Sequence, residues 1–206
     1  MLVFSQQALA FIAVPKTGTT AIEMALKRKA DIIFTKERKH ITAQRFHNRI
    51  APFLDEVFDL RPDRFAVMRD PEQQISSWYR YRTRDALAGT PRYTGDISFD
   101  EFVRRLIKED APRHTGVGSQ LRMLASQTGE VLVHHLFRYE NWPRLELFLE
   151  QRFGEEVEMK DYNRSPKGST DLDPATRAGL RRARSAEFEL YDRLAEADGY
   201  LRTEIG

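Results

Sequence analysis

The sequence predicts an α/β fold, a single three-layer domain with a mostly parallel central sheet and helices on both faces. Short apolar runs typical of buried strands alternate along the chain with segments whose apolar residues recur at helical spacing. Such alternation favours parallel strands joined by helices. The chain has 206 residues, of which 41% are hydrophobic, and this suits one domain with a substantial core.

The first half of the chain contains three predicted strands with helices between and after them. The strands are short apolar runs bounded by turn-forming or charged residues, expected at 11–14 (FIAV), 31–34 (DIIF) and 64–69 (RFAVMR). The helices are expected to start near 18–20, to cover 42–58 with a break near Pro52, and to cover 72–82.

Two loops are predicted in the middle of the chain, at 84–97 and 109–118, because both segments contain glycine and proline. Between them, Ser98 with Glu101 three residues later predicts the N-cap of a helix. The remaining elements are a strand within 130–141, a helix over 141–153, a weaker strand over 157–163 and a mostly helical tail from Pro174.

Composition excludes several classes of function. The 33 basic and 31 acidic residues nearly balance, so we expect no nucleic-acid partner. The absence of cysteine removes disulfides and thiolate chemistry and fits a reducing compartment. No apolar run approaches the roughly 20 residues of a membrane span. The start of the chain lacks the basic segment of a signal peptide, so we expect a cytoplasmic protein.

Three polar segments follow predicted strands and are expected to share one crevice. They are PKTGTT at 15–20, RDP at 69–71 and YEN at 139–141. In an open α/β sheet, ligands bind beyond the carboxyl ends of the strands. We therefore expect the functional site where these segments meet.

The chemistry of the first segment predicts an anion site. A helix N-terminus offers unpaired N–H groups, and Gly18 lets the backbone approach a ligand. Thr19 and Thr20 add hydroxyl donors, and Lys16 adds a mobile charge. A plain turn with a threonine cap is the alternative, but capping does not explain Lys16 and Gly18 together.

The stretch FIAVPKTGTTAIEMAL resembles the 5′-phosphosulfate loop of the sulfotransferase family, in which a P-K-[ST]-G-[ST]-[ST] turn follows the first strand. The stretch FAVMRDPEQQISSWYRY resembles the family's 3′-phosphate signature, with Arg69 at a strand end and Ser77 eight positions later. FRYEN at 137–141 and YNRSPKG at 162–168 are similar to looser patterns of the family. The chain is most similar to bacterial members that resemble Golgi carbohydrate sulfotransferases.

The resemblance implies that the chain is one sulfotransferase-like domain over 1–206 with a P-loop-like phosphosulfate-binding turn. Its donor would be 3′-phosphoadenosine 5′-phosphosulfate (PAPS), used without a metal, and its acceptor a hydroxyl or amine of a small molecule or carbohydrate. Lys167 is included because Pro166-Lys167-Gly168 partly matches a later R-K-G motif found in part of the family. The residues expected to hold the donor are Pro15, Lys16, Thr17, Gly18, Thr19, Thr20, Arg69, Ser77 and Lys167.

Two residues are expected to take part in the chemistry. Lys16 would neutralise the bridging oxygen as the 5′-phosphate leaves. His40, just before the cap-like Thr42, would take the acceptor's proton, although a capping or surface role explains it equally well. Glu23 and Glu140 are the alternative bases. Of the other histidines, His47 is expected to be solvated, and at least one of 134 and 135 to be structural.

Other functions remain open on the sequence alone. A nucleotide kinase is disfavoured because the loop lacks the G-x-x-x-x-G-K-[ST] order, and Asp70 looks like a helix cap and not a Mg²⁺ ligand. A non-catalytic nucleotide-binding module of the same fold is the second alternative. The arginines at 80, 82, 84 and 92 form a rim that would grip an anionic sugar or peptide, although a solvated face is the slightly favoured interpretation.

Overall fold

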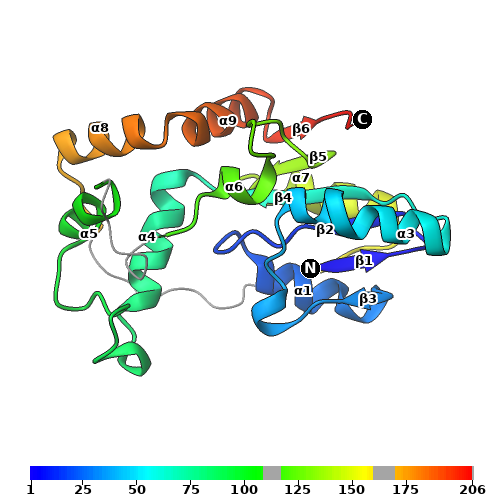
Figure 1. Cartoon of the computed structure of the whole chain (residues 1–206), viewed down its shortest axis with the longest axis horizontal. Helices are drawn as coiled ribbons and strands as arrows, with labels where there is room; N and C mark the ends of the chain where they lie inside the picture. Colours follow the sequence, from blue (N-terminus) through cyan, green and yellow to red (C-terminus); the bar gives the residue numbers. More distant parts are fainter. Residues whose placement is uncertain (109–116, 160–169, 206) are drawn as a thin grey trace.

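The computed structural model describes residues 1–108, 117–159 and 170–205, which form an α/β structure around a mixed six-stranded sheet (Figure 1). The strand order is β3-β1-β2-β4-β5-β6. The strands are β1 (Leu2–Phe4), β2 (Leu9–Phe11), β3 (Ile32–Ile33), β4 (Asp63–Met68), β5 (His135–Arg138) and β6 (Tyr200–Arg202).

The centre of the sheet is parallel, as predicted, but its outer strands are not. β4 pairs in parallel with both β2 and β5, whereas β1, β3 and β6 join antiparallel. β1 and β2 are joined by a tight turn in which the Ala8 N–H bonds to the Ser5 carbonyl, and so short a link permits only antiparallel pairing. The strand predicted at 11–14 begins earlier than expected, since β2 covers Leu9–Phe11 and residues 12–14 follow it.

Ten α-helical and π-helical segments surround the sheet in the described ranges. They are α1 (Thr19–Leu26), α2 (Ala43–Arg45), the π-helix η3 (Phe46–Ile50), α3 (Ala51–Phe58), α4 (Pro71–Arg82), α5 (Phe99–Leu106), α6 (Gln120–Leu124), α7 (Trp142–Phe153), α8 (Pro174–Ala183) and α9 (Ser185–Glu196). Short 3₁₀ turns lie at η1 (Lys27–Lys29), η2 (Lys36–Arg38) and η4 (Asp85–Leu87). None of these helices is both long and apolar enough to cross a membrane.

Several local predictions can be checked directly. Ser98 caps α5 by accepting a hydrogen bond from the Glu101 N–H, as predicted. The predicted break near Pro52 is a π-helical turn that precedes α3, which suits a residue with no N–H to donate. No strand forms at 157–159, and the rest of that predicted strand lies outside the described residues. β6 shows that the tail is not helical throughout.

Successive residues of a strand point to opposite faces of the sheet, and they therefore belong to two different hydrophobic clusters. Phe11, Phe65 and Phe137 belong to the cluster that includes residues of α1 and α7. Ala66 and Leu136 belong to the other, together with residues of α2, η3, α3, α6 and α9. A third cluster joins α4, α5, α8 and α9, and Figure 1 shows α4, α5 and α8 gathered beside the sheet. Because α4 begins just after β4 ends, this group extends the carboxyl edge of the parallel strands.

Candidate functional site

The loop after β2 is closed by its own threonine hydroxyls. Thr17 and Thr19 donate from Oγ1 to the Val14 carbonyl, at 2.9 and 2.6 Å, and both side chains are buried. Gly18 is the N-cap of α1, and no side chain caps that helix. The threonine cap of the alternative interpretation is therefore not formed, because Thr19 bonds to the strand end and not to the helix N–H groups. Thr20, in the first turn of α1, is half-buried.

Gly18 is required by both conformation and space. Its φ is 74°, in the left-handed region that favours glycine. A Cβ placed there would lie 2.6 Å from Cη2 of Trp142 and 3.2 Å from Cε2 of Tyr139. The loop thus packs on the start of α7, so the need for glycine comes first from these rings. Lys16 also has a positive φ, 68°.

Lys16 lies among aromatic rings and other cations. Its Nζ is 3.6 Å from the centre of the Tyr81 ring and 5.0 Å from that of Trp78. Burial, followed by the positive charges of Arg84, Arg82 and Arg69, lowers the pKa of Lys16 to about 7. Because the charges that shift this pKa are all positive, the environment of the lysine favours an added anion.

Arg69 is fixed through its backbone, which leaves its side chain to face the site. Gln120 accepts from the Arg69 N–H at 2.9 Å and donates to the Arg69 carbonyl at 2.8 Å. The Arg69 guanidinium lies 4.5 Å from the centre of the Tyr139 ring, and its buried Nε has no hydrogen-bond partner. The sequence does not reveal this role of Gln120, because it comes from the undetected helix α6.

One face of α4 is directed at the loop. Gln74 donates from Nε2 to the Pro15 carbonyl at 3.2 Å, and Trp78 and Tyr81 contact Lys16. Ser77, which is buried, occupies this same i, i+3, i+4, i+7 face. Ser77 therefore shares the helix face that contacts the loop, and Arg69 lies near enough to Lys16 for its charge to act on that lysine.

Glu140 ties the other two strand ends together. Its Oε1 accepts from the Asp70 N–H at 3.1 Å, and its Oε2 accepts from the Tyr191 hydroxyl at 2.9 Å and lies 3.5 Å from Arg138 Nε. Asp70 itself caps α4 by accepting from the Gln73 N–H, as expected. The segments PKTGTT, RDP and YEN thus meet at one edge of the sheet, which confirms their predicted convergence.

His40 lies next to the strand end that precedes the loop. Its Nδ1–H donates to the Ala13 carbonyl at 2.7 Å, which leaves Nε2 as the proton acceptor of the neutral ring. Desolvation, aided by Lys39 and opposed by the Ala13 bond, lowers the pKa of His40 below its usual value. Glu23, an alternative base, is engaged in an ion pair with Lys39 at 2.9 Å.

The arginines after the middle of α4 are not a uniform solvated face. Arg82 is 6% exposed and lies 5.5 Å from the centre of the Trp78 ring. Arg84 is half-buried, with its guanidinium carbon 4.8 Å from the centre of the Tyr81 ring. Burial, with the charge of Arg69, lowers the pKa of Arg80. Of the four, Arg92 alone is exposed, so the solvated interpretation fits that residue best.

Unpaired buried polar atoms concentrate at this edge. In the described ranges, five buried side-chain N or O atoms have no hydrogen-bond partner. Four of them belong to β4's end and α4: Arg69 Nε, Gln74 Oε1, Ser76 Oγ and Trp78 Nε1. Buried polar groups normally have partners, so these four atoms need an explanation, and a bound ligand or water would supply one.

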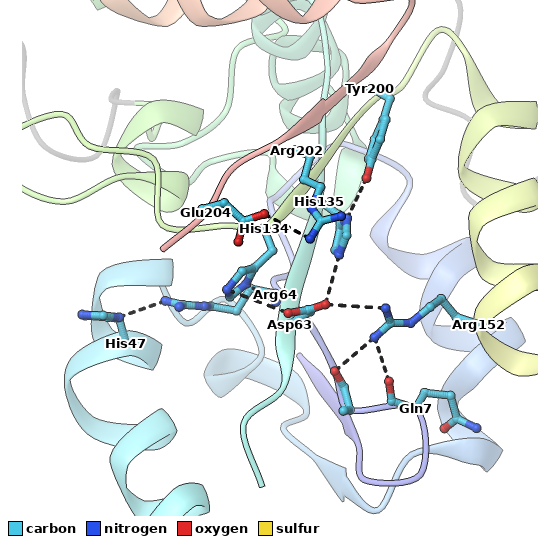
Figure 2. Close-up of polar contacts among 11 residues, drawn as sticks. Gln7, His47, Asp63, Arg64, His134, His135, Arg152, Tyr200, Arg202 and Glu204 are labelled. Atoms are coloured by element: carbon cyan, nitrogen blue, oxygen red, sulfur yellow. Dashed lines mark hydrogen bonds and ion pairs between the residues drawn. The ribbon is translucent and has the colours of Figure 1, made fainter. Parts of the chain in front are cut away.

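A second polar network lies at the opposite, amino edge of the parallel strands (Figure 2). Asp63 Oδ2 lies 3.3 Å from His135 Nε2 and 3.5 Å from Arg152 Nη1. His134 Nδ1 accepts from the Arg64 N–H, and His47 Nδ1 lies 3.1 Å from Arg64 Nη1. The structural role expected of the histidine pair is therefore observed, whereas the prediction that His47 is solvated is wrong.

Lys167 and the 162–168 segment lie outside the described residues, so this part of the predicted donor site has no structural description. Among the described residues, no cluster of three or more His, Asp or Glu side chains is arranged to hold a metal ion. Comparisons of the chain with protein-family models, with curated proteins and with solved structures found no match.

Proposed function

We propose that this protein is a sulfotransferase that moves a sulfuryl group from PAPS to a hydroxyl or amine of an acceptor. The observation that carries the proposal is the meeting of Lys16, on the loop after β2, with Arg69, on the end of β4, whose positive charge contributes to the lowered pKa of that lysine. PAPS carries an anion at each end of its ribose, so it requires two separated cationic subsites. The fold would then be a three-layer domain with a P-loop-like turn.

Each end of the donor has matching groups. The 5′-phosphosulfate would lie on the loop from Pro15 to Thr20, where Lys16 and the uncapped start of α1 supply charge and N–H donors. The 3′-phosphate would take up the unpaired donor Nε of Arg69, with the hydroxyl of Ser77 nearby.

In the reaction, the acceptor oxygen or nitrogen forms a bond to sulfur while the bond from sulfur to the 5′-phosphate oxygen breaks. Adenosine 3′,5′-bisphosphate leaves with the electron pair, and protonated Lys16 stabilises the charge that develops on the leaving oxygen. The acceptor's proton passes to His40 Nε2, because the Ala13 carbonyl holds the other ring nitrogen. Glu23 and Glu140 are weaker choices because other groups already engage both carboxylates.

A thermal-shift comparison of nucleotides tests the proposal. Adenosine 3′,5′-bisphosphate should stabilise the protein without metal by about 2.7 kcal/mol at a hundredfold excess over Kd. AMP should stabilise it less, and Arg69→Gln should remove the difference between the two. Arg49→Gln, an exposed arginine of the π-helix, serves as the matched control.

Equal stabilisation by AMP and the bisphosphate would overturn the proposal. A larger shift with ATP and Mg²⁺ would favour the nucleotide kinase. Tight binding of the bisphosphate, with no transfer from PAPS to any acceptor in a library, would favour the non-catalytic module.

A further inference from the structure

The outer face of α3 exposes a group of apolar side chains. Of the six large hydrophobic residues that are exposed in the described ranges, three lie in this eight-residue helix, namely Phe53, Val57 and Phe58. Each is more than half exposed, at 51%, 55% and 59%. The rings of Phe53 and Phe58 contact each other edge to face, with their centres 5.7 Å apart, and Val57 lies one turn after Phe53. Exposed apolar side chains that adjoin one another in this way are typical of interaction surfaces.

Charged residues lie at both ends of this apolar group. The elements α2, η3 and α3 follow one another without a gap over residues 43–58. Four exposed residues of this segment have the i, i+3, i+4, i+7 spacing of one helical face: Arg49, Pro52, Phe53 and Glu56. The face therefore has a cation at one end, an anion at the other and apolar side chains in the middle.

The order of these charges does not favour the helix itself. A helix is positive at its N-terminus and negative at its C-terminus, so an anion suits its first turn and a cation its last. Here Arg45 and Arg49 come before α3, and Glu56 lies in its last turn. In the described parts of the chain, neither Arg49 nor Glu56 takes part in an ion pair, whereas Asp55 pairs with Arg61 at 2.8 Å. The two charges of the face are thus available to a partner outside this chain.

The face is complementary to itself. The midpoint between Arg49 and Glu56 along the chain falls between Pro52 and Phe53. If two copies of the face meet antiparallel, with a two-fold axis at this midpoint, each Arg49 lies opposite Glu56 of the second copy. The phenylalanine and proline side chains then pack together about the axis. Such a contact has the apolar centre and the polar rim of a protein interface.

We propose that the protein forms a two-fold symmetric dimer through the outer face of α3, with Arg49 of each copy paired with Glu56 of the other. A second copy is the occupant that the charge pattern indicates, because one sequence supplies both halves of the match. Figure 1 shows α3 at the opposite end of the molecule from α5 and α8, so the contact lies away from the helices beside the candidate site. The inference does not depend on the proposed function.

Sedimentation velocity of the full chain over a range of concentrations tests the dimer. The wild-type protein should be dimeric at about 100 μM, within reach of a small interface. Phe53→Asp should make it monomeric. Leu147→Asp, which changes an exposed apolar residue of α7, is the matched control and should leave the dimer unchanged. Thermal unfolding followed by circular dichroism establishes that both variants are folded.

Charge reversal tests the antiparallel register. Arg49→Glu and Glu56→Arg should each raise the Kd of the dimer by about tenfold, because the two-fold axis repeats every repulsive contact. The double variant Arg49→Glu/Glu56→Arg restores both opposite-charge pairs, so its Kd should return to within about threefold of the wild-type value. A contact of any other register would give no such recovery.

A wild-type protein that stays monomeric at about 100 μM would overturn the proposal, as would a dimer that persists in Phe53→Asp. Two further results would also overturn it, since they would deny the pairing of Arg49 with Glu56. One is that the single reversals leave the Kd unchanged, and the other is that the double variant dimerises as weakly as the single ones.

Discussion

At the amino end of β4, Asp63 lies between His135 and Arg152, and Tyr200 closes the network from β6 (Figure 2). At the carboxyl end of the same strand, Arg69 faces a tyrosine ring, and its Nε has no partner. Both ends carry arginines and acids, but at the carboxyl end the described ion pair joins Glu140 to Arg138 and not to Arg69. The charge of Asp63 is therefore paired within the protein, whereas Arg69 keeps an unpaired Nε that suits the proposed donor.

The largest expected effect is on turnover, and it compares two histidines, His40 at the carboxyl edge and His47 at the amino edge. If His40 is the base, His40→Ala should lower turnover by about 10² to 10⁴, the usual contribution of general acid–base catalysis. The variant should still bind adenosine 3′,5′-bisphosphate normally, because His40 bonds to the Ala13 carbonyl and not to the donor site. Single-turnover rates with PAPS and an accepted sugar provide the measurement.

His47→Ala is the matched control, because His47 contacts Arg64 at the amino edge. It should leave turnover unchanged, whatever it does to stability. A His40→Ala variant that keeps its rate and pH profile would reduce His40 to a turn residue, and Glu23 and Glu140 would be tested next.

The next effect concerns Gly18, a position at the carboxyl edge that is constrained by packing as well as by backbone conformation. Gly18→Ala should lower the free energy of unfolding by about 2–4 kcal/mol, since a left-handed φ and a collision with Trp142 add. Gly154→Ala is the control, because its φ of 71° is similar and nothing lies within 4 Å of an added Cβ. That variant should lose only about 1 kcal/mol. Chemical denaturation measures both, and equal losses would contradict the packing role of Trp142.

A smaller effect follows from the depressed pKa of Lys16. The lysine must be protonated to hold a phosphate, so bisphosphate affinity should fall by up to about tenfold per pH unit above pH 7. For stability the sign is opposite. The unfolded chain holds this proton up to about pH 10.5, so the lysine disfavours folding most at pH 7 and below, and stability rises from pH 7 to 10.5.

Titration calorimetry at pH 8 in buffers of different ionisation enthalpy should show proton uptake when the bisphosphate binds. Lys16→Met, which keeps a long side chain against Tyr81, should abolish that uptake. Uptake of the same size in this variant would assign the proton to another group.

The smallest effect belongs to the amino edge. Burial lowers the pKa of His134 and His135, so both bind protons less readily in the folded state than in the unfolded state. Their neutral forms are favourable above about pH 6.5, and stability should decline as the pH falls below that value. Asp63→Asn should cost about 1 kcal/mol at pH 7, the net worth of a hydrogen bond, and should leave bisphosphate binding unchanged. A loss of nucleotide affinity in Asp63→Asn would mean that the two edges are coupled.

The part of the fold that the sequence predicts is the part that local signals encode. The strand RFAVMR, the helix after it and the Ser98 cap all appear where expected, because each depends on neighbouring residues. The sequence does not predict β1 and β6, because each has only three residues. β1 depends on pairing with β2 across a short turn, and β6 depends on pairing with β5, which is distant along the chain.

The candidate site shows the same division. The turn at 15–20 and the position of Arg69 at a strand end can be predicted because motif spacing encodes them. The contacts that restrain these residues cannot, since Gln120 and Trp142 come from α6 and α7, which are distant from the motifs along the chain. The contact of His47 cannot be predicted from local sequence either, because its partner Arg64 lies on a strand and not on the same helix.

The left-handed backbone of Lys16 has a consequence for how this position tolerates change. With φ at 68°, a residue that has a Cβ is strained by about 1–2 kcal/mol relative to glycine. Desolvation and neighbouring arginines act against its charge as well. Selection for folding alone would replace this lysine with glycine or asparagine, so a library of variants sorted only for stability should be depleted of lysine at position 16. If Lys16 has the proposed role, the protein gives up stability at this position in exchange for a positive charge held in a fixed place.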